Sequence, residues 1–172
     1  LTVHPDLPCT RAEVGGRSLF LLGHVLDYQH PESTDQAIVA EILRAAATFA
    51  EVLKAFDPFA GRWAAIYGDK GQAFVFHDPA ALRQVHHGRD SDGGLWCGSR
   101  PELLARIANR PLDTTNLNSL QQAGVLELGA THFWPGTGSA FLGIDRLLPN
   151  HYLNVRTGEV QRYWPTAAVP QL

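Results

Sequence analysis

The sequence predicts an α+β domain with mostly antiparallel sheet, and three observations predict it. Short apolar runs come in pairs around turns that contain glycine, which is typical of β-hairpins. A long amphipathic stretch precedes these hairpins, and shorter helical patterns follow them. Because the helices are grouped around the hairpins, the pattern does not favour an alternating parallel α/β sheet.

The composition indicates a single globular domain. The chain has 172 residues, of which 45% are hydrophobic and 18% charged, and this length can bury a core. The net charge of −3 and the lack of a basic run argue against nucleic-acid binding. No apolar run approaches the roughly 20 residues of a membrane helix. No signal-peptide pattern is present, so we expect a cytoplasmic protein without a membrane partner.

The first part of the chain predicts strands. Residues 1–17 contain prolines and a glycine pair, so they predict irregular chain with one short edge strand. The run 18–23 is apolar, short and bounded by glycine, which favours a buried strand over a helix.

Helical spacing of apolar residues follows over 35–56. The stretch is long for one helix, and residues 45–48 are the expected break between two. Ser33 with Gln36 three residues later fits a capping box at the start of the first helix. Asp57-Pro58 ends the second helix.

Three β-hairpins are predicted after these helices, each from two short runs around a turn. They pair 62–67 with 72–77, 83–87 with 95–99, and 152–155 with 160–164.

Two more helices are predicted in the second half. Pro101 at the first helical position, with Ser99 as N-cap, opens a helix that ends near Ile107. A further helix falls within 113–127, and 131–141 is expected to be loop.

Six segments, in their order along the chain, resemble the N-terminal glutamine amidotransferase domain of the asparagine synthetases. This family belongs to the N-terminal-nucleophile (Ntn) hydrolases. The resemblance implies a four-layer α/β/β/α sandwich of two mostly antiparallel sheets, here without the first catalytic strand. It implies one domain over 1–165 and the start of a linker at 166–172. The six segments are 19–29, 33–43, 59–87, 95–105, 141–155 and 157–165.

The family's active-site motifs can be placed on this sequence by the same resemblance. Its Asn-Gly-Glu motif, which supplies the oxyanion amide and contacts the substrate, falls on Leu22, Gly23 and His24. Only the glycine is kept, and a leucine side chain cannot donate a hydrogen bond to an oxyanion. The family's Ser-Asp pair, whose carboxylate holds the glutamine ammonium, falls on Thr34-Asp35. Gly23, His24 and Asp35 are therefore the expected remnant of a substrate pocket.

The resemblance thus implies a catalytically degenerate domain. The chain begins with Leu1, where the family has its nucleophilic cysteine, so we expect no catalytic residue and no glutaminase activity. The domain would act as a scaffold or recognition element in asparagine biosynthesis or a related amide-forming reaction. Its expected partner is a C-terminal synthetase-like domain or a second copy. ATP and Mg²⁺ would bind only to that synthetase domain, and no cofactor is expected here.

Two other functions remain open. One is an active glutamine-hydrolysing domain whose N-terminal cysteine lies upstream of this sequence. The other is a free-standing module that binds a small amino-acid-like ligand around Asp35 and His24.

Other reactive side chains are expected to be structural. No metal site is expected, because the adjacent residues His86 and His87 would point to opposite faces of a strand. Cys9 and Cys97 are expected to be ordinary thiols. Asp78 is expected to cap a turn.

Overall fold

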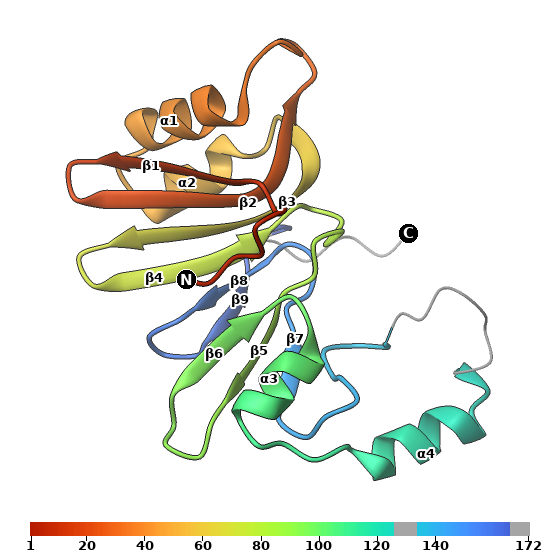
Figure 1. Cartoon of the computed structure of the whole chain (residues 1–172). Helices are drawn as coiled ribbons and strands as arrows, with labels where there is room; N and C mark the ends of the chain where they lie inside the picture. The colour runs from red at the N-terminus through yellow and green to blue at the C-terminus, as the bar shows by residue number, and fades with distance from the viewer. Residues whose placement is uncertain (126–133, 166–172) are drawn as a thin grey trace. The chain divides into compact units, whose positions relative to one another are not determined.

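The computed structural model describes residues 1–125 and 134–165 of the chain, which divides into two compact units (Figure 1). The first unit contains Leu1–Arg83 and the chain from Pro149 onward, and the second contains Gln84–Leu148. Each unit has its own antiparallel sheet, and the described residues form four helices. The predicted α+β class with two antiparallel sheets is therefore confirmed.

A six-stranded antiparallel sheet forms the first unit. The predicted edge strand and the predicted buried strand are both present, and the buried one is longer than expected. The first and third predicted hairpins are also confirmed. In order across the sheet, the strands are β1 (Cys9–Val14), β2 (Arg17–Asp27), β3 (Phe59–Asp69), β4 (Gln72–His77), β8 (His151–Asn154) and β9 (Val160–Arg162).

The turn between β3 and β4 is shorter than predicted. It consists of Lys70 and Gly71, and both have positive φ angles, of 46° and 76°. Two consecutive residues with positive φ make a turn whose twist matches that of the flanking strands. The Gly71 position suits a residue without a Cβ.

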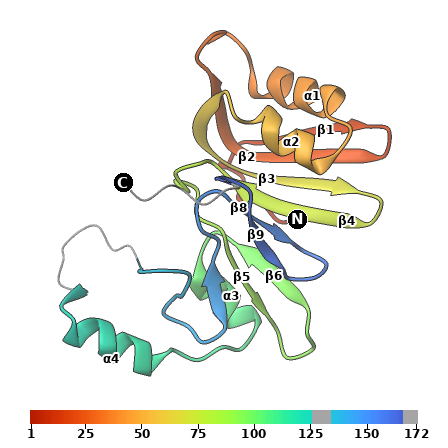
Figure 2. The same ribbon diagram turned by 180° about the vertical axis from the view of Figure 1, so that it is seen from behind.

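Two helices lie on one face of this sheet, as Figure 2 shows from behind. They are α1 (Asp35–Ala45) and α2 (Phe49–Ala55), so the predicted break between two helices is confirmed. The predicted cap of the first helix is wrong: Thr34, one residue beyond Ser33, is the N-cap, and its hydroxyl accepts from the Ala37 N–H at 3.2 Å.

The capping box lies at the second helix. There Thr48 and Glu51 exchange side-chain-to-backbone hydrogen bonds. The pairs Ser33/Gln36 and Thr48/Glu51 both place Gln or Glu three positions after a hydroxyl residue, so the spacing in the sequence could not show which pair forms the capping box.

The core of the first unit lies between the helices and the sheet. Alternate residues of β2 are buried, as expected for a strand with one covered face. Aromatic rings fill the space beneath α2. The centroid of the Phe56 ring lies 4.5 Å from that of the Trp63 ring and 5.3 Å from that of the Phe76 ring. Fully buried members of this core include Leu19, Leu21, Val39, Leu43, Val52, Ala65 and Phe76.

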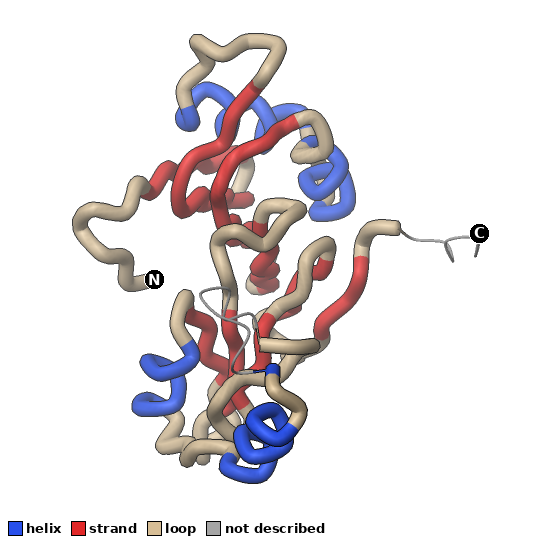
Figure 3. The backbone as a smooth tube through the Cα atoms, turned by 90° about the vertical axis from the view of Figure 1, so that its right-hand side faces the viewer, coloured by secondary structure: helices blue, strands red, loops and turns tan. Residues whose placement is uncertain are grey.

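A three-stranded antiparallel sheet forms the second unit. Figure 3 shows the strands in red and the helices in blue. The second predicted hairpin is confirmed, although its first strand begins three residues later than predicted. The third strand was not predicted, because three residues are too few to show an alternating pattern. Across the sheet the order is β6 (Leu95–Gly98), β5 (His86–Arg89) and β7 (Ile144–Arg146).

Both predicted helices of this unit are present, as α3 (Pro101–Ile107) and α4 (Thr114–Gln122). The N-cap of α3 is Arg100 rather than Ser99, and its side chain makes no capping hydrogen bond. Pro101 fixes the first helical position, so the residue directly before it must be the cap. Part of the loop predicted at 131–141 lies outside the described residues.

We expect the helix-covered face of the large sheet to carry much of the stability of the first unit. Leu21 is fully buried on β2, whereas Leu26 on the same strand is 60% exposed. Leu21→Ala should lower the free energy of unfolding by about 3 kcal/mol, because it leaves a cavity in the core. Urea denaturation would measure it. Leu26→Ala is the matched control, and equal losses for the two variants would contradict this placement of the core.

Candidate functional site

The carboxylate of Asp35 is hydrogen-bonded within the protein. It lies in the first turn of α1, and one oxygen accepts from the backbone N–H of Val25 at 2.9 Å. The other oxygen lies 2.9 Å from Nδ1 of His24. The Asp35 side chain is 19% exposed, whereas that of His24 is 67% exposed. Asp35 therefore joins the start of α1 to the end of β2.

Gly23 has a structural reason to be glycine. Its φ is +109°, and a Cβ added there would lie 2.2 Å from the backbone oxygen of Arg62 on β3. Its own N–H donates to the carbonyl of Pro8 at 2.8 Å. Any larger residue would push the two strands apart. The glycine shared with the family motif is thus required by the approach of β3, whatever binds nearby.

Leu22 is a half-buried residue in the middle of β2. It is paired with Cys9 on β1 and with Ala64 on β3. Its side chain has no polar atom, so it offers no donor to an oxyanion. The structure thus brings together all four sequence-predicted positions, Leu22, Gly23, His24 and Asp35, but the polar contacts among them are internal.

Arg83 lies next to these positions and was not predicted. Its Nε would be 2.9 Å from a Cβ added to Gly23. Among the described residues, this buried Nε has no hydrogen-bond partner. Burial, and then the positive charge of Arg62, lower the pKa of Arg83 from its ordinary value, and Asp78 partly offsets this. Sixty residues separate Arg83 from Gly23 in the sequence, so local spacing could not reveal their proximity.

Asp78 holds the turn that places Arg83. Its side chain is almost fully buried at the end of β4. Its two oxygens accept from the backbone N–H groups of Ala80, Leu82 and Arg83 at 2.9–3.2 Å. The predicted turn-capping role of Asp78 is confirmed.

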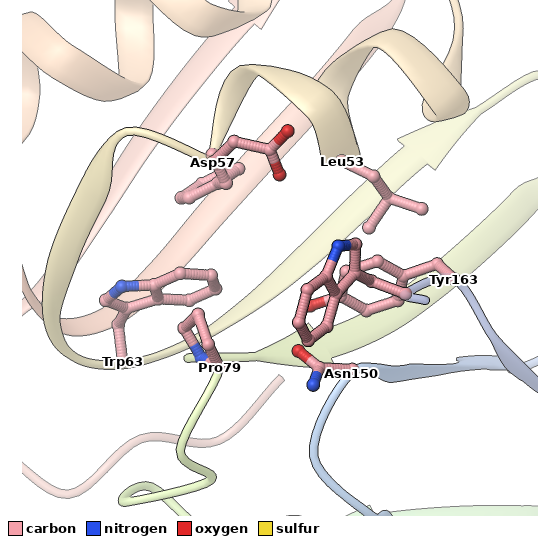
Figure 4. Close-up of a pocket in the computed structure, with 8 residues that line it drawn as sticks. Leu53, Asp57, Trp63, Pro79, Asn150 and Tyr163 are labelled. Carbon is pink, nitrogen blue, oxygen red and sulfur yellow. The ribbon is translucent and has the colours of Figure 1, made fainter. Parts of the chain in front are cut away.

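A cleft with several aromatic residues in its walls lies elsewhere in the first unit, beside α2 (Figure 4). Its main cavity has a volume of about 420 Å³. A second cavity of about 410 Å³ shares Leu53, Asp57, Tyr163 and Trp164 with it. We call these two cavities the α2 cleft. Its main cavity is lined by Leu53, Phe56, Asp57, Trp63, Pro79, Asn150, Tyr163 and Trp164.

The sequence did not reveal the α2 cleft. Its aromatic residues have the spacing of ordinary core positions, and Phe56 and Trp63 do pack in the core. Trp164 lines the cleft and is 63% exposed, and this exposure could not be read from the sequence.

Tyr163 enters the α2 cleft as a neutral phenol. Burial, followed by the negative charges of Asp57 and Asp78, raises its pKa to about 12. It stays protonated at neutral pH and does not add a negative charge to the cleft.

Cys9 and Cys97 are free thiols. Within residues 1–125 and 134–165, no group of three His, Cys, Asp or Glu side chains could hold a metal ion. Over the same residues, no helix has the length and apolar character needed to cross a membrane.

No protein-family model matches the chain, and no curated protein matches it. The family resemblance therefore depends on the residues quoted for it and stays a prediction.

Asp35 should matter for stability more than its exposed partner does. Asp35→Ala removes the acceptor of the Val25 N–H, so we expect a loss of about 1–2 kcal/mol in the free energy of unfolding. His24→Ala removes only an exposed ion pair and should cost less than about 0.5 kcal/mol. Urea denaturation of both variants would measure this. An unchanged Asp35→Ala variant would mean that the carboxylate is not a structural tie.

His86 should make the chain less stable in acid. Burial, then the charge of Arg146 on the paired strand, lower its pKa from 6.5 to about 4. Between these values the unfolded chain binds a proton that the folded chain does not, so stability falls as pH falls. We expect a loss of about 2–3 kcal/mol from pH 7 to pH 4.5 at this residue.

Denaturation of the protein over this pH range would measure the effect. His86→Gln should remove much of the pH dependence, and His87, whose pKa is also lowered by burial, should retain part of it. His4→Gln changes an exposed histidine and is the control. An identical pH dependence in wild type and His86→Gln would refute the assignment.

Proposed function

We propose that this chain is a catalytically degenerate glutamine amidotransferase-like domain of an asparagine synthase-like, ATP-dependent amide-forming protein. Its role is that of a scaffold or recognition domain. The observation that carries this proposal is the state of Asp35. In the resembled family the matching carboxylate holds the ammonium group of glutamine, but here each of its two oxygens already has a partner within the protein, the Val25 N–H and the His24 ring.

The lost oxyanion donor supports the same proposal. Leu22 stands where the family has its amide, and its neighbours across the sheet are Cys9 and Ala64. Removing one oxyanion donor typically lowers the rate of such enzymes by a factor of about 100 to 1,000. Neither Cys9 nor Ala64 supplies a replacement amide.

The residue pattern of the large sheet supports the proposed sandwich. On β2, Phe20 and Leu22 alternate with the buried residues that face α1 and α2, so they belong to the opposite face. Ile66 is paired with Phe20 and also belongs to that face. A sheet that is apolar on both faces needs a second layer to cover it. This agrees with a four-layer Ntn-hydrolase architecture.

In this proposal the partner is a synthetase-like domain or a second copy of the chain. That synthetase domain would bind ATP and Mg²⁺, and the amine would come from free ammonia or from another amine. The setting would be cytoplasmic.

A second candidate function is favoured by Arg83. Its buried Nε beside Gly23 has no partner among the described residues, so it could pair with the carboxylate of a small ligand. The chain would then be a binding module for an amino-acid-like molecule, as the sequence also allows.

A glutaminase assay tests the main proposal. Purified chain incubated with L-glutamine should release no glutamate above the background of a heat-denatured sample, because the expected position holds no oxyanion donor and the Asp35 carboxylate is already hydrogen-bonded within the protein. Glutamate release that scales with protein concentration would refute degeneracy and favour an active hydrolase.

A thermal-shift experiment with L-glutamine and other amino acids separates the scaffold from the binding module. Binding to the folded state raises the melting temperature by mass action. The scaffold proposal expects no shift with any of them. A saturable shift that is lost in Arg83→Gln but kept in Arg44→Gln, which changes an arginine on α1, would favour the binding module instead.

A further inference from the structure

We propose that the main cavity of the α2 cleft binds a small organic cation, namely a primary amine attached to an apolar or aromatic body. This inference does not depend on the proposed amidotransferase ancestry, because the cleft shares no residue with the positions carried over from that family. The evidence is the size of the cleft, the nature of its walls and the position of one carboxylate.

The main cavity has the size and lining of a small-molecule site. Its volume of about 420 Å³ falls within the range of roughly 300–1,000 Å³ that is usual for ligand pockets. The walls come from segments far apart in sequence: the end of α2, the middle of β3, the turn after β4 and the chain beside β8 and β9. Trp63 packs against Phe56 and Phe76 in the core, so this wall is part of the folded core itself.

Asp57 gives the cleft its charge preference. It is the one charged residue among the described residues that line the main cavity. Within the described part of the chain, no arginine or lysine forms an ion pair with it, and no donor is hydrogen-bonded to its carboxylate. Figure 4 shows Asp57 on the opposite side of the cavity from Asn150. The Asp57 carboxylate therefore has room for a cationic partner, and the ammonium group of a ligand would be such a partner.

The aromatic walls favour the same charge. The faces of Trp and Tyr rings carry negative potential and attract cations, most strongly where water is excluded. Trp164, which is 63% exposed, and the half-buried Tyr163 supply the accessible rings of the main cavity. Trp63 lies on the other side of the cavity from Tyr163 in Figure 4 and is buried in the core. Burial raises the pKa of Tyr163 to about 12, so it stays a neutral phenol and contributes an aromatic ring and no charge.

The walls also argue against an amino acid as ligand. An amino acid carries a carboxylate next to its ammonium, and that carboxylate would need a cation of its own. Lys54 lines the second cavity and not the main one. A simple amine therefore fits the main cavity better than the corresponding amino acid does.

Phenethylamine is the probe that tests this proposal, with heteronuclear NMR of the tryptophan indole groups as readout. The chain has four tryptophans, and two of them, Trp63 and Trp164, line the cleft. We expect saturable shifts of these two indole signals and none for Trp96 and Trp134 in the second unit. Trp164→Phe assigns its signal. L-phenylalanine should bind more weakly, and hydrocinnamate, which has a carboxylate in place of the amine, should not bind.

Asp57→Asn should weaken phenethylamine binding about twofold to fivefold, because the amide can still accept a hydrogen bond but no longer carries the charge that pairs with the ammonium at this exposed site. Glu41→Gln removes the same charge from the exposed face of α1 and should leave binding unchanged. Absence of saturable shifts in the wild-type protein would overturn the proposal. So would equal binding of hydrocinnamate, or equal affinities of wild type and Asp57→Asn.

Discussion

The packing of α1 and α2 on one face of the six-stranded sheet is the constraint on which the rest of the first unit depends. It buries every second residue of β2 and fixes the aromatic cluster of Phe56, Trp63 and Phe76. Because the two helices are attached at this face, their ends have fixed positions on the sheet. The start of α1 brings Asp35 to the end of β2, and the end of α2 forms one wall of the cleft.

This packing gives a structural reason for the polar residue at the start of α1. A carboxylate at the start of a helix is stabilised by the helix dipole and by backbone donors. Asp35 receives such a donor from Val25, so the fold alone gives a reason for aspartate at this position. The same holds for Gly23, since the Arg62 carbonyl leaves no space for a side chain. A residue that agrees with a family motif is therefore weak evidence for activity when the fold itself requires that residue. A polar group that lacks a partner within the protein is stronger evidence for a binding role.

Two polar groups without a hydrogen-bond partner among the described residues lie at other positions of the first unit. Asp57 borders a cavity of about 420 Å³ without an internal partner among the described residues, and the Arg83 Nε is buried beside Gly23 without one. Both depend on distant parts of the chain. Asp57 needs Tyr163 and Asn150 to become part of a cleft, and Arg83 needs the turn that Asp78 holds. Neither residue belongs to a local motif.

The sequence by itself determined the α+β class, the three hairpins, the break between α1 and α2 and the turn-capping role of Asp78, because these follow from periodicity and turn chemistry within a few residues. Only the tertiary structure decided which residue caps each helix, that β8 pairs with β4, and that the short strand β7 joins β5. It also decided that Asp35 is tied to β2 while Asp57 faces a cavity. The reason is that hydrogen-bond partners and cavities are made by segments that meet in space, and local spacing carries no information about which segments meet.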